Sequence, residues 1–147
     1  MLNLRDYWMG RDVTHAREMT PELYTNAAYL LSVVNKLLAL AVVDGVQLDA
    51  HPHTGTPVSS GWRPAEINAA TPGASRGSPH ITGEGIDIFD PEGDLDEWCW
   101  ANQHQLARLG LYLEHPSHTK GWCHLQTRVP RSQRALPENA RRHWFMP

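Results

Sequence analysis

Cysteine is scarce in this sequence, with only Cys99 and Cys123 among 147 residues. Two cysteines do not make the disulfide framework that holds small secreted domains together. Cys99 falls on a helical pattern and Cys123 on a strand pattern, so we interpret both as buried thiols, although the sequence leaves open whether they are bridged. A strong excess of charge is also lacking. The net charge is −3 with neutral histidines, which gives no general affinity for polyanions and no reason to expect a nucleic-acid partner.

A hydrophobic leader is absent as well, because charged residues between positions 5 and 12 stand where a signal peptide has its apolar segment. The apolar run Leu30 to Val43 is interrupted by Asn35 and Lys36 and is shorter than the roughly 20 residues that cross a bilayer. We therefore expect a protein made in the cytoplasm without a signal peptide, and no membrane insertion. The length suits a single domain over residues 1–147 that is large enough to bury a core.

The stretch from Ser78 to Ile88 is the most informative part of the chain. Asp87 lies in the apolar run Gly85 to Phe89, which has the pattern of a buried strand. Burying a carboxylate there is costly unless a cation or hydrogen-bond donors accept it. His80 precedes Asp87 by seven residues, and a second short apolar run contains His124.

Imidazole nitrogen and carboxylate oxygen are typical zinc ligands, and catalytic zinc sites commonly have three protein ligands with one position left open. His80, Asp87 and His124 are therefore our candidate metal ligands, with Zn²⁺ as the expected cofactor. Taken singly, each has a simpler interpretation as a core histidine or a hydrogen-bonded carboxylate. Ser78 is expected either to hydrogen-bond near His80 or to be an ordinary loop serine.

Three motifs occur together in the chain: Ser-Gly-Trp-Arg, then Ser-x-His-x-x-Gly-x-x-x-Asp, then Trp-x-His. In this order they resemble the zinc D,D-carboxypeptidase and L-alanyl-D-glutamate endopeptidase group, which shares its fold with the hedgehog signalling domain. The opening Leu4 to Asp12 also resembles phage-borne members of the group. The matching residues are Ser60, Gly61, Trp62, Arg63, His80, Gly83, Asp87 and His124.

The resemblance implies zinc-dependent hydrolysis of peptide bonds in peptidoglycan stem peptides, as in an endolysin or a virion-associated lysin. Such a protein would reach the cell wall only when released or delivered by a phage system. The alternative, from a different functional class, is a non-catalytic zinc-binding module that recognises the wall or assembles into a virion.

Arg63 matches the arginine that in this group lies near the metal and holds a substrate carboxylate or a developing oxyanion, a task that suits a guanidinium. The group often has an acid three residues before its last metal ligand, but Gly121 occupies that position here. Because glycine cannot act as a base, another residue must supply the general base. Glu114 is our first candidate and His118 the second. Their simpler interpretations are a surface acid at a strand end and a loop histidine.

The resemblance implies an α+β fold of the hedgehog/D,D-peptidase type, in which helices flank a small antiparallel sheet. We expect an ordered N-terminal arm over residues 1–19 and a basic C-terminal tail over residues 131–147 that docks through Trp144 to Met146. The first predicted helix begins at Pro21 after a Thr20 cap, and Asp44-Gly45 ends it or the turn that follows it. Two more are predicted over Ala65 to Ala70 and, with an Asp94 cap, over Leu95 to Leu109. Predicted strands cover Val58 to Arg63, Gly85 to Phe89, Leu111 to Glu114 and Trp122 to Val129, the last two forming a hairpin.

Overall fold

The apolar stripe after Thr20 forms the longest helix, α3 (Pro21–Val43), in the computed structural model, which describes residues 1–147. Its start is as predicted: the Thr20 hydroxyl accepts a hydrogen bond from the Leu23 N–H at 3.1 Å, and Pro21 takes the first turn. Leu30, Val34, Leu37, Leu38 and Ala41 are fully buried. The helix is also long and apolar enough to span a membrane, but a core helix has the same properties, so this does not identify a membrane segment.

The sheet has five strands in the order β1 (Val58–Ser60), β2 (Gly85–Asp90), β4 (Gly121–Gln126), β3 (Tyr112–Glu114) and β5 (Trp144–Phe145). The first three pairings are antiparallel, and the hairpin of β3 and β4 is as predicted. The fourth is parallel, because the chain after β4 loops back and lays β5 alongside β3. The prediction of a purely antiparallel sheet is therefore wrong, and the fold is α+β with a small mixed sheet.

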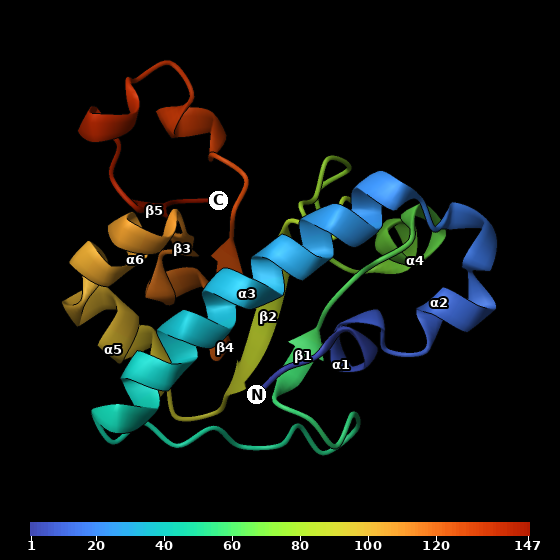
Figure 1. Cartoon of the computed structure of the whole chain (residues 1–147), viewed down its shortest axis with the longest axis horizontal. Coiled ribbons are helices and arrows are strands. Elements are labelled where there is room, and N and C mark those ends of the chain that lie inside the picture. Colours follow the sequence, from blue (N-terminus) through green and yellow to red (C-terminus); the bar gives the residue numbers. More distant parts are fainter.

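One face of the sheet lies against α3, which crosses β2 and β4 in Figure 1. Ile86, Ile88 and Leu125 point to that side and belong to the same hydrophobic core as the buried stripe of α3. Because side chains alternate along a strand, Asp87 and His124 lie on the other face. The alternation of apolar and polar residues in β2 thus separates the core from the candidate metal ligands.

The N-terminal arm is ordered, with α1 (Leu4–Trp8), α2 (Arg11–Thr14) and η1 (Ala16–Glu18). It packs beside β1, where the Trp62 N–H donates to the Tyr7 carbonyl at 3.0 Å. The segment after β1 is extended and then forms α4 (Ala65–Ala70), with the predicted bounds. The predicted strand up to Arg63 is too long, because regular pairing ends at Ser60.

The predicted helix from Leu95 to Leu109 is divided into α5 (Asp94–Ala101) and α6 (Gln103–Leu109) at Asn102, whose backbone leaves the helical region. The predicted Asp94 cap is also wrong. The carboxylate of Asp90 accepts hydrogen bonds from the N–H groups of Leu95 and Asp96 at 3.1 and 2.9 Å. An acid at the end of β2 therefore replaces a cap within the helix.

Short 3₁₀ turns complete the chain. η2 (Pro116–His118) lies within the hairpin loop, and η3 (Arg131–Gln133) and η4 (Glu138–Ala140) lie in the C-terminal segment. β4 ends at Gln126 and is therefore shorter than the predicted strand, which continued to Val129. Cys99 and Cys123 are both buried and free, in agreement with the interpretation as thiols.

Candidate metal centre

One row of side chains runs across the sheet on the face opposite α3. Ser60 is paired with Asp87, Asp87 with His124, and Glu114 with Phe145. Leu113 is paired with Leu125, so the next step of that register sets Glu114 opposite His124. Directly opposite residues share a face of a sheet. Every strand therefore contributes one residue to the row, and the members from β2 and β4, Asp87 and His124, are candidate metal ligands.

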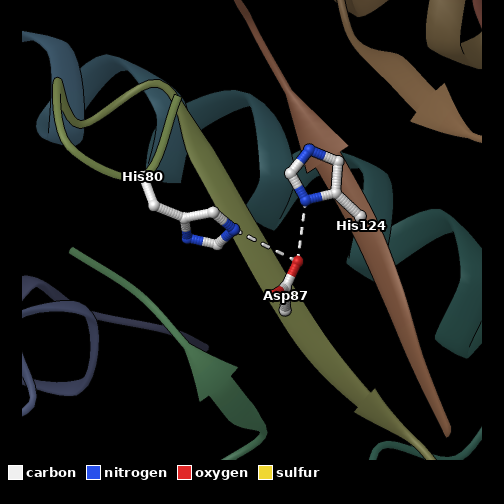
Figure 2. A group of neighbouring side chains, drawn as sticks. All are labelled: His80, Asp87 and His124. Carbon is white, nitrogen blue, oxygen red and sulfur yellow. Dashed lines mark hydrogen bonds and ion pairs between the residues drawn. The ribbon is translucent and has the colours of Figure 1, made fainter. Parts of the chain in front are cut away.

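His80 joins the row from the turn that precedes β2 (Figure 2). The Ser78 hydroxyl accepts a hydrogen bond from the backbone N–H of His80 at 3.2 Å, which is the first of the two roles expected for this serine. Gly83 has φ +79°, a backbone conformation that favours glycine. A Cβ on Gly85 would lie 2.9 Å from Pro79 and 3.3 Å from the His124 ring. The two glycines thus allow the turn to fold tightly over β2 and bring His80 to Asp87.

The three predicted ligands converge on one carboxylate oxygen. Asp87 Oδ1 lies 3.3 Å from His80 Nε2 and 2.7 Å from His124 Nδ1 (Figure 2). One potential ligand atom from each residue lies within 4.8 Å of the other two. The side chains of His80, His124 and Asp87 are 3%, 7% and 13% exposed, so the group is largely shielded from water.

Burial and neighbouring charges shift the pKa values of the three candidate ligands in different directions. Burial lowers the pKa of His80 in spite of the nearby Asp87 carboxylate, and so favours the neutral imidazole that binds a metal. Burial also opposes a charged His124, but the hydrogen bond to Asp87, the charge of that carboxylate and the contact with Gln126 together outweigh burial and raise the pKa of His124. Burial would raise the pKa of Asp87, yet His80 and His124 together hold that pKa far below its usual range. Asp87 is therefore an anion at any ordinary pH.

The donor set fits zinc. Zinc bonds of about 2.0 to 2.1 Å at tetrahedral angles put neighbouring ligand atoms roughly 3.3 Å apart. The His80–Asp87 separation of 3.3 Å already has this value, whereas the His124–Asp87 separation of 2.7 Å is a direct hydrogen bond that would lengthen on binding. His80 Nδ1 lies 2.8 Å from the Gly61 carbonyl, so that nitrogen carries the hydrogen and Nε2 keeps the lone pair.

Arg63 reaches the group from the segment after β1. Its Nη2 lies 3.8 Å from Asp87 Oδ2, on the side of the carboxylate away from the histidines. Its Nε donates to the Ser60 hydroxyl at 3.2 Å, and its Nη1 donates to Asn68 Oδ1 at 3.0 Å. These partners hold the guanidinium beside the candidate metal ligands, where the resemblance places an arginine.

The two candidate bases differ in position. Glu114 is half-buried on the site face, and burial, together with the charge of Asp87, raises its pKa against the opposing influence of His124. His118 lies on η2 in the hairpin loop and is exposed, near enough to Glu114 to lower the pKa of that carboxyl. The geometry therefore favours Glu114 as the acid next to the ligands.

Sequence reasoning missed two groups that contact the ligands. The Gly61 carbonyl hydrogen-bonds His80, and Gln126 Oε1 lies 2.9 Å from His124 Nε2. The sequence indicated Gly61 only as part of the Ser-Gly-Trp-Arg motif, without a role for its carbonyl. Gln126 follows His124 by two residues, so the alternation of strand side chains could have placed it on the site face.

Two surface hollows, of about 320 and 540 Å³, lie away from the candidate ligands. One is lined by Asp44, Gly45, Val46, Asp94, Glu97, Trp98 and Ala101, and the other by Ala107, Glu138, Asn139, Arg141 and His143. The chain matches no protein-family model, no curated protein sequence and no solved structure. The side chains of the metal group and the motifs in the sequence are therefore the features that bear on function.

Proposed function

We propose that this protein is a zinc-dependent peptidase that hydrolyses peptide bonds in peptidoglycan stem peptides. The observation that carries the proposal is the convergence of His80 Nε2, Asp87 Oδ1 and His124 Nδ1 in one shielded group. Two imidazoles and one carboxylate make a common catalytic zinc set. The substrate class comes from the resemblance of the three sequence motifs, and so does the assignment to the hedgehog/D,D-peptidase type of α+β fold.

When bound, zinc would polarise a peptide carbonyl and acidify a water molecule. Arg63 then has the position and charge to stabilise negative charge that develops on the substrate, or to bind a substrate carboxylate. Its side chain is 11% exposed and is already oriented by Ser60 and Asn68. An oriented cation needs little reorganisation during the reaction, which is why such groups stabilise transition states well.

We assign Glu114 as the general base that takes a proton from the attacking water and passes it to the leaving amine. A raised pKa suits this exchange, because a base that accepts and then releases a proton works best near the operating pH. His118 is the second candidate and would act from the exposed loop beside Glu114. In this proposal the protein acts on the wall after release or delivery by a phage system.

The decisive assay measures free amino groups released from purified peptidoglycan by the zinc-loaded protein, with and without a chelator. We expect release by the wild type, abolition by the chelator, and a loss of roughly 100-fold or more in Glu114→Gln, since positioned acids and bases contribute about 10² to 10⁴ in rate. Glu138→Gln, which changes an exposed glutamate on η4, is the matched control. No release by zinc-loaded wild type would refute the enzyme proposal for this substrate.

A non-catalytic zinc-binding module is the second candidate function, and one observation favours it. Gly121, with φ +99°, occupies the position where the peptidase group often has its acid. In this case zinc would bind with the same ligands, the protein would sediment with peptidoglycan, and no amine would be released. Elemental analysis of the purified protein together with the sedimentation assay separates the two candidates from each other and from a metal-free structural domain.

A further inference from the structure

Gln126 is the one side chain that contacts the outer nitrogen of His124. In Figure 2 one ring nitrogen of His124 points to Asp87 and the other points away from it. That outer nitrogen, Nε2, lies 2.9 Å from Gln126 Oε1, and the contact is buried. The other end of the same amide, Gln126 Nε2, donates to the Arg128 carbonyl at 2.7 Å. Gln126 is 5% exposed, so water does not compete for either contact.

The Arg128 carbonyl fixes which way the amide faces. A carbonyl oxygen only accepts, so the NH₂ end of Gln126 must point to Arg128 and the oxygen end to His124. That oxygen also only accepts, so Nε2 of His124 must carry a hydrogen. The other nitrogen, Nδ1, donates to the Asp87 carboxylate at 2.7 Å. A metal bound here would take the place of the hydrogen on Nδ1, because Gln126 keeps the hydrogen on Nε2. A backbone carbonyl four residues from the ligand therefore determines which nitrogen of His124 is free to bind a metal.

Arg128 is itself held in place by the segment that carries the other two ligands. Its guanidinium contacts Glu84 Oε1 through both Nε and Nη2, each at 3.2 Å, and it also hydrogen-bonds the Gly77 carbonyl. The Thr127 N–H donates to the Glu84 carbonyl at 2.9 Å. The end of β4 is thereby fastened to the turn between His80 and Asp87, and the Arg128 carbonyl keeps its position relative to Gln126.

We propose that Gln126 is a positioning residue for the metal site: its amide, oriented by the Arg128 carbonyl, holds His124 with hydrogen on Nε2 and presents Nδ1 as the ligand. This inference rests on the proposed metal site. Outer contacts of this kind orient a ligating histidine, and their removal typically weakens metal binding by about 10- to 100-fold.

The first test is ¹⁵N NMR of the histidine rings in the wild-type protein, both metal-free and zinc-loaded. We expect Nε2 of His124 to be a hydrogen-bearing, pyrrole-type nitrogen in both forms, and Nδ1 to change its shift when zinc is added. A pyridine-type Nε2 in either form would overturn the inference. This measurement needs no variant, so it decides the matter even where a substitution impairs folding.

The second test compares zinc affinity, measured by competition with a chromophoric chelator, in two variants. Gln126→Leu removes the acceptor and should bind zinc about 10- to 100-fold more weakly. Gln126→Glu keeps an oxygen that accepts from Nε2–H but loses the donor to the Arg128 carbonyl. It should retain hydrogen on Nε2 and bind zinc more weakly than wild type but more tightly than Gln126→Leu. Equal affinity of wild type and Gln126→Leu would overturn the inference.

Gln133→Leu is the matched control. Gln133 is also buried, at 3% exposure, but its amide oxygen accepts from the Arg142 N–H at 3.0 Å and does not contact a candidate ligand. It should lose stability without losing zinc affinity. The outcomes also separate this inference from the proposed function. If the wild-type protein does not bind zinc, the proposed metal site is refuted. If zinc affinity is the same with and without the Gln126 amide, only the role assigned to Gln126 is refuted.

Discussion

Replacing Asp96 with asparagine should stabilise the protein at alkaline pH and leave its stability unchanged in acid. Asp96 is 3% exposed, and its Oδ1 has no hydrogen-bond partner. Its Oδ2 accepts the Thr119 hydroxyl at 2.7 Å. Burial, with a smaller contribution from the charges of Asp90 and Glu114, raises the pKa of Asp96 to about 6 against an ordinary 3.8. The folded protein therefore holds this proton more tightly than the unfolded chain does.

The sign and size of this stability change follow from the difference in the Asp96 pKa between the folded and unfolded states. Below about pH 4 the carboxyl is protonated in both states and costs nothing, whereas above about pH 6 it is ionised in both states and the full destabilisation is present. A difference of about two pKa units corresponds to roughly 3 kcal/mol, which is an upper value because the asparagine amide must also be buried. For 147 residues, an unfolding entropy of about 2.1 cal/mol/K per residue converts each kcal/mol into roughly 3 °C of Tm. We expect a gain of about 3 to 9 °C at pH 8.

Thermal unfolding of the metal-free protein, followed by circular dichroism at pH 4 and pH 8, tests this. Differences between variant and wild type at each pH cancel the contributions of the histidines. Asp94→Asn is the control, since Asp94 is exposed in the first turn of the same helix, and it should change stability by less than about 0.5 kcal/mol. An Asp96→Asn protein that is less stable than wild type at pH 8, or whose gain is the same at both pH values, would refute the reasoning.

Three further predictions concern the scaffold and the metal. Tyr7→Phe removes the buried hydroxyl that donates to the Gly85 carbonyl at 2.9 Å and should cost about 1 to 3 kcal/mol in urea unfolding; an unchanged midpoint would contradict it. Gly61→Ala would set a Cβ 2.0 Å from the Tyr7 carbonyl oxygen, so it should lower both stability and zinc affinity, while Gly77→Ala, with open space around it, should do neither. Zinc at 100 times its Kd should stabilise the wild type by about 2.7 kcal/mol and Asp87→Asn hardly at all; equal stabilisation of both proteins in calorimetry would exclude Asp87 as a ligand.

Local signals in the sequence were sufficient for much of the fold. The period of the apolar residues after Thr20 predicted α3, and the cap and proline at its start are as expected. The apolar run around Asp87 predicted β2, and the predicted helix end at Leu109 is the end of α6. The structure also brings His80, Asp87 and His124 together. That they bind a metal remains a prediction.

The failures share a physical cause, which is that the deciding partner is distant in sequence or competes with a local signal. β5 contains two residues, and its pairing with β3 depends on a contact about 30 positions away along the chain. The Asp90 cap comes from the preceding strand and replaces the acid predicted within α5. Gln126 acquires its role only through the Arg128 carbonyl, which no residue pattern shows.

The row from Ser60 through Asp87 and His124 to Glu114 and Phe145 makes the site a product of strand alignment. A slip of one position in any strand would move the residue that this strand contributes to the opposite face of the sheet, which packs on the hydrophobic core. A slipped strand would therefore remove its member from the site altogether instead of displacing it slightly. Amide protons of β2 and β4 should accordingly exchange with solvent only as fast as metal-binding capacity is lost.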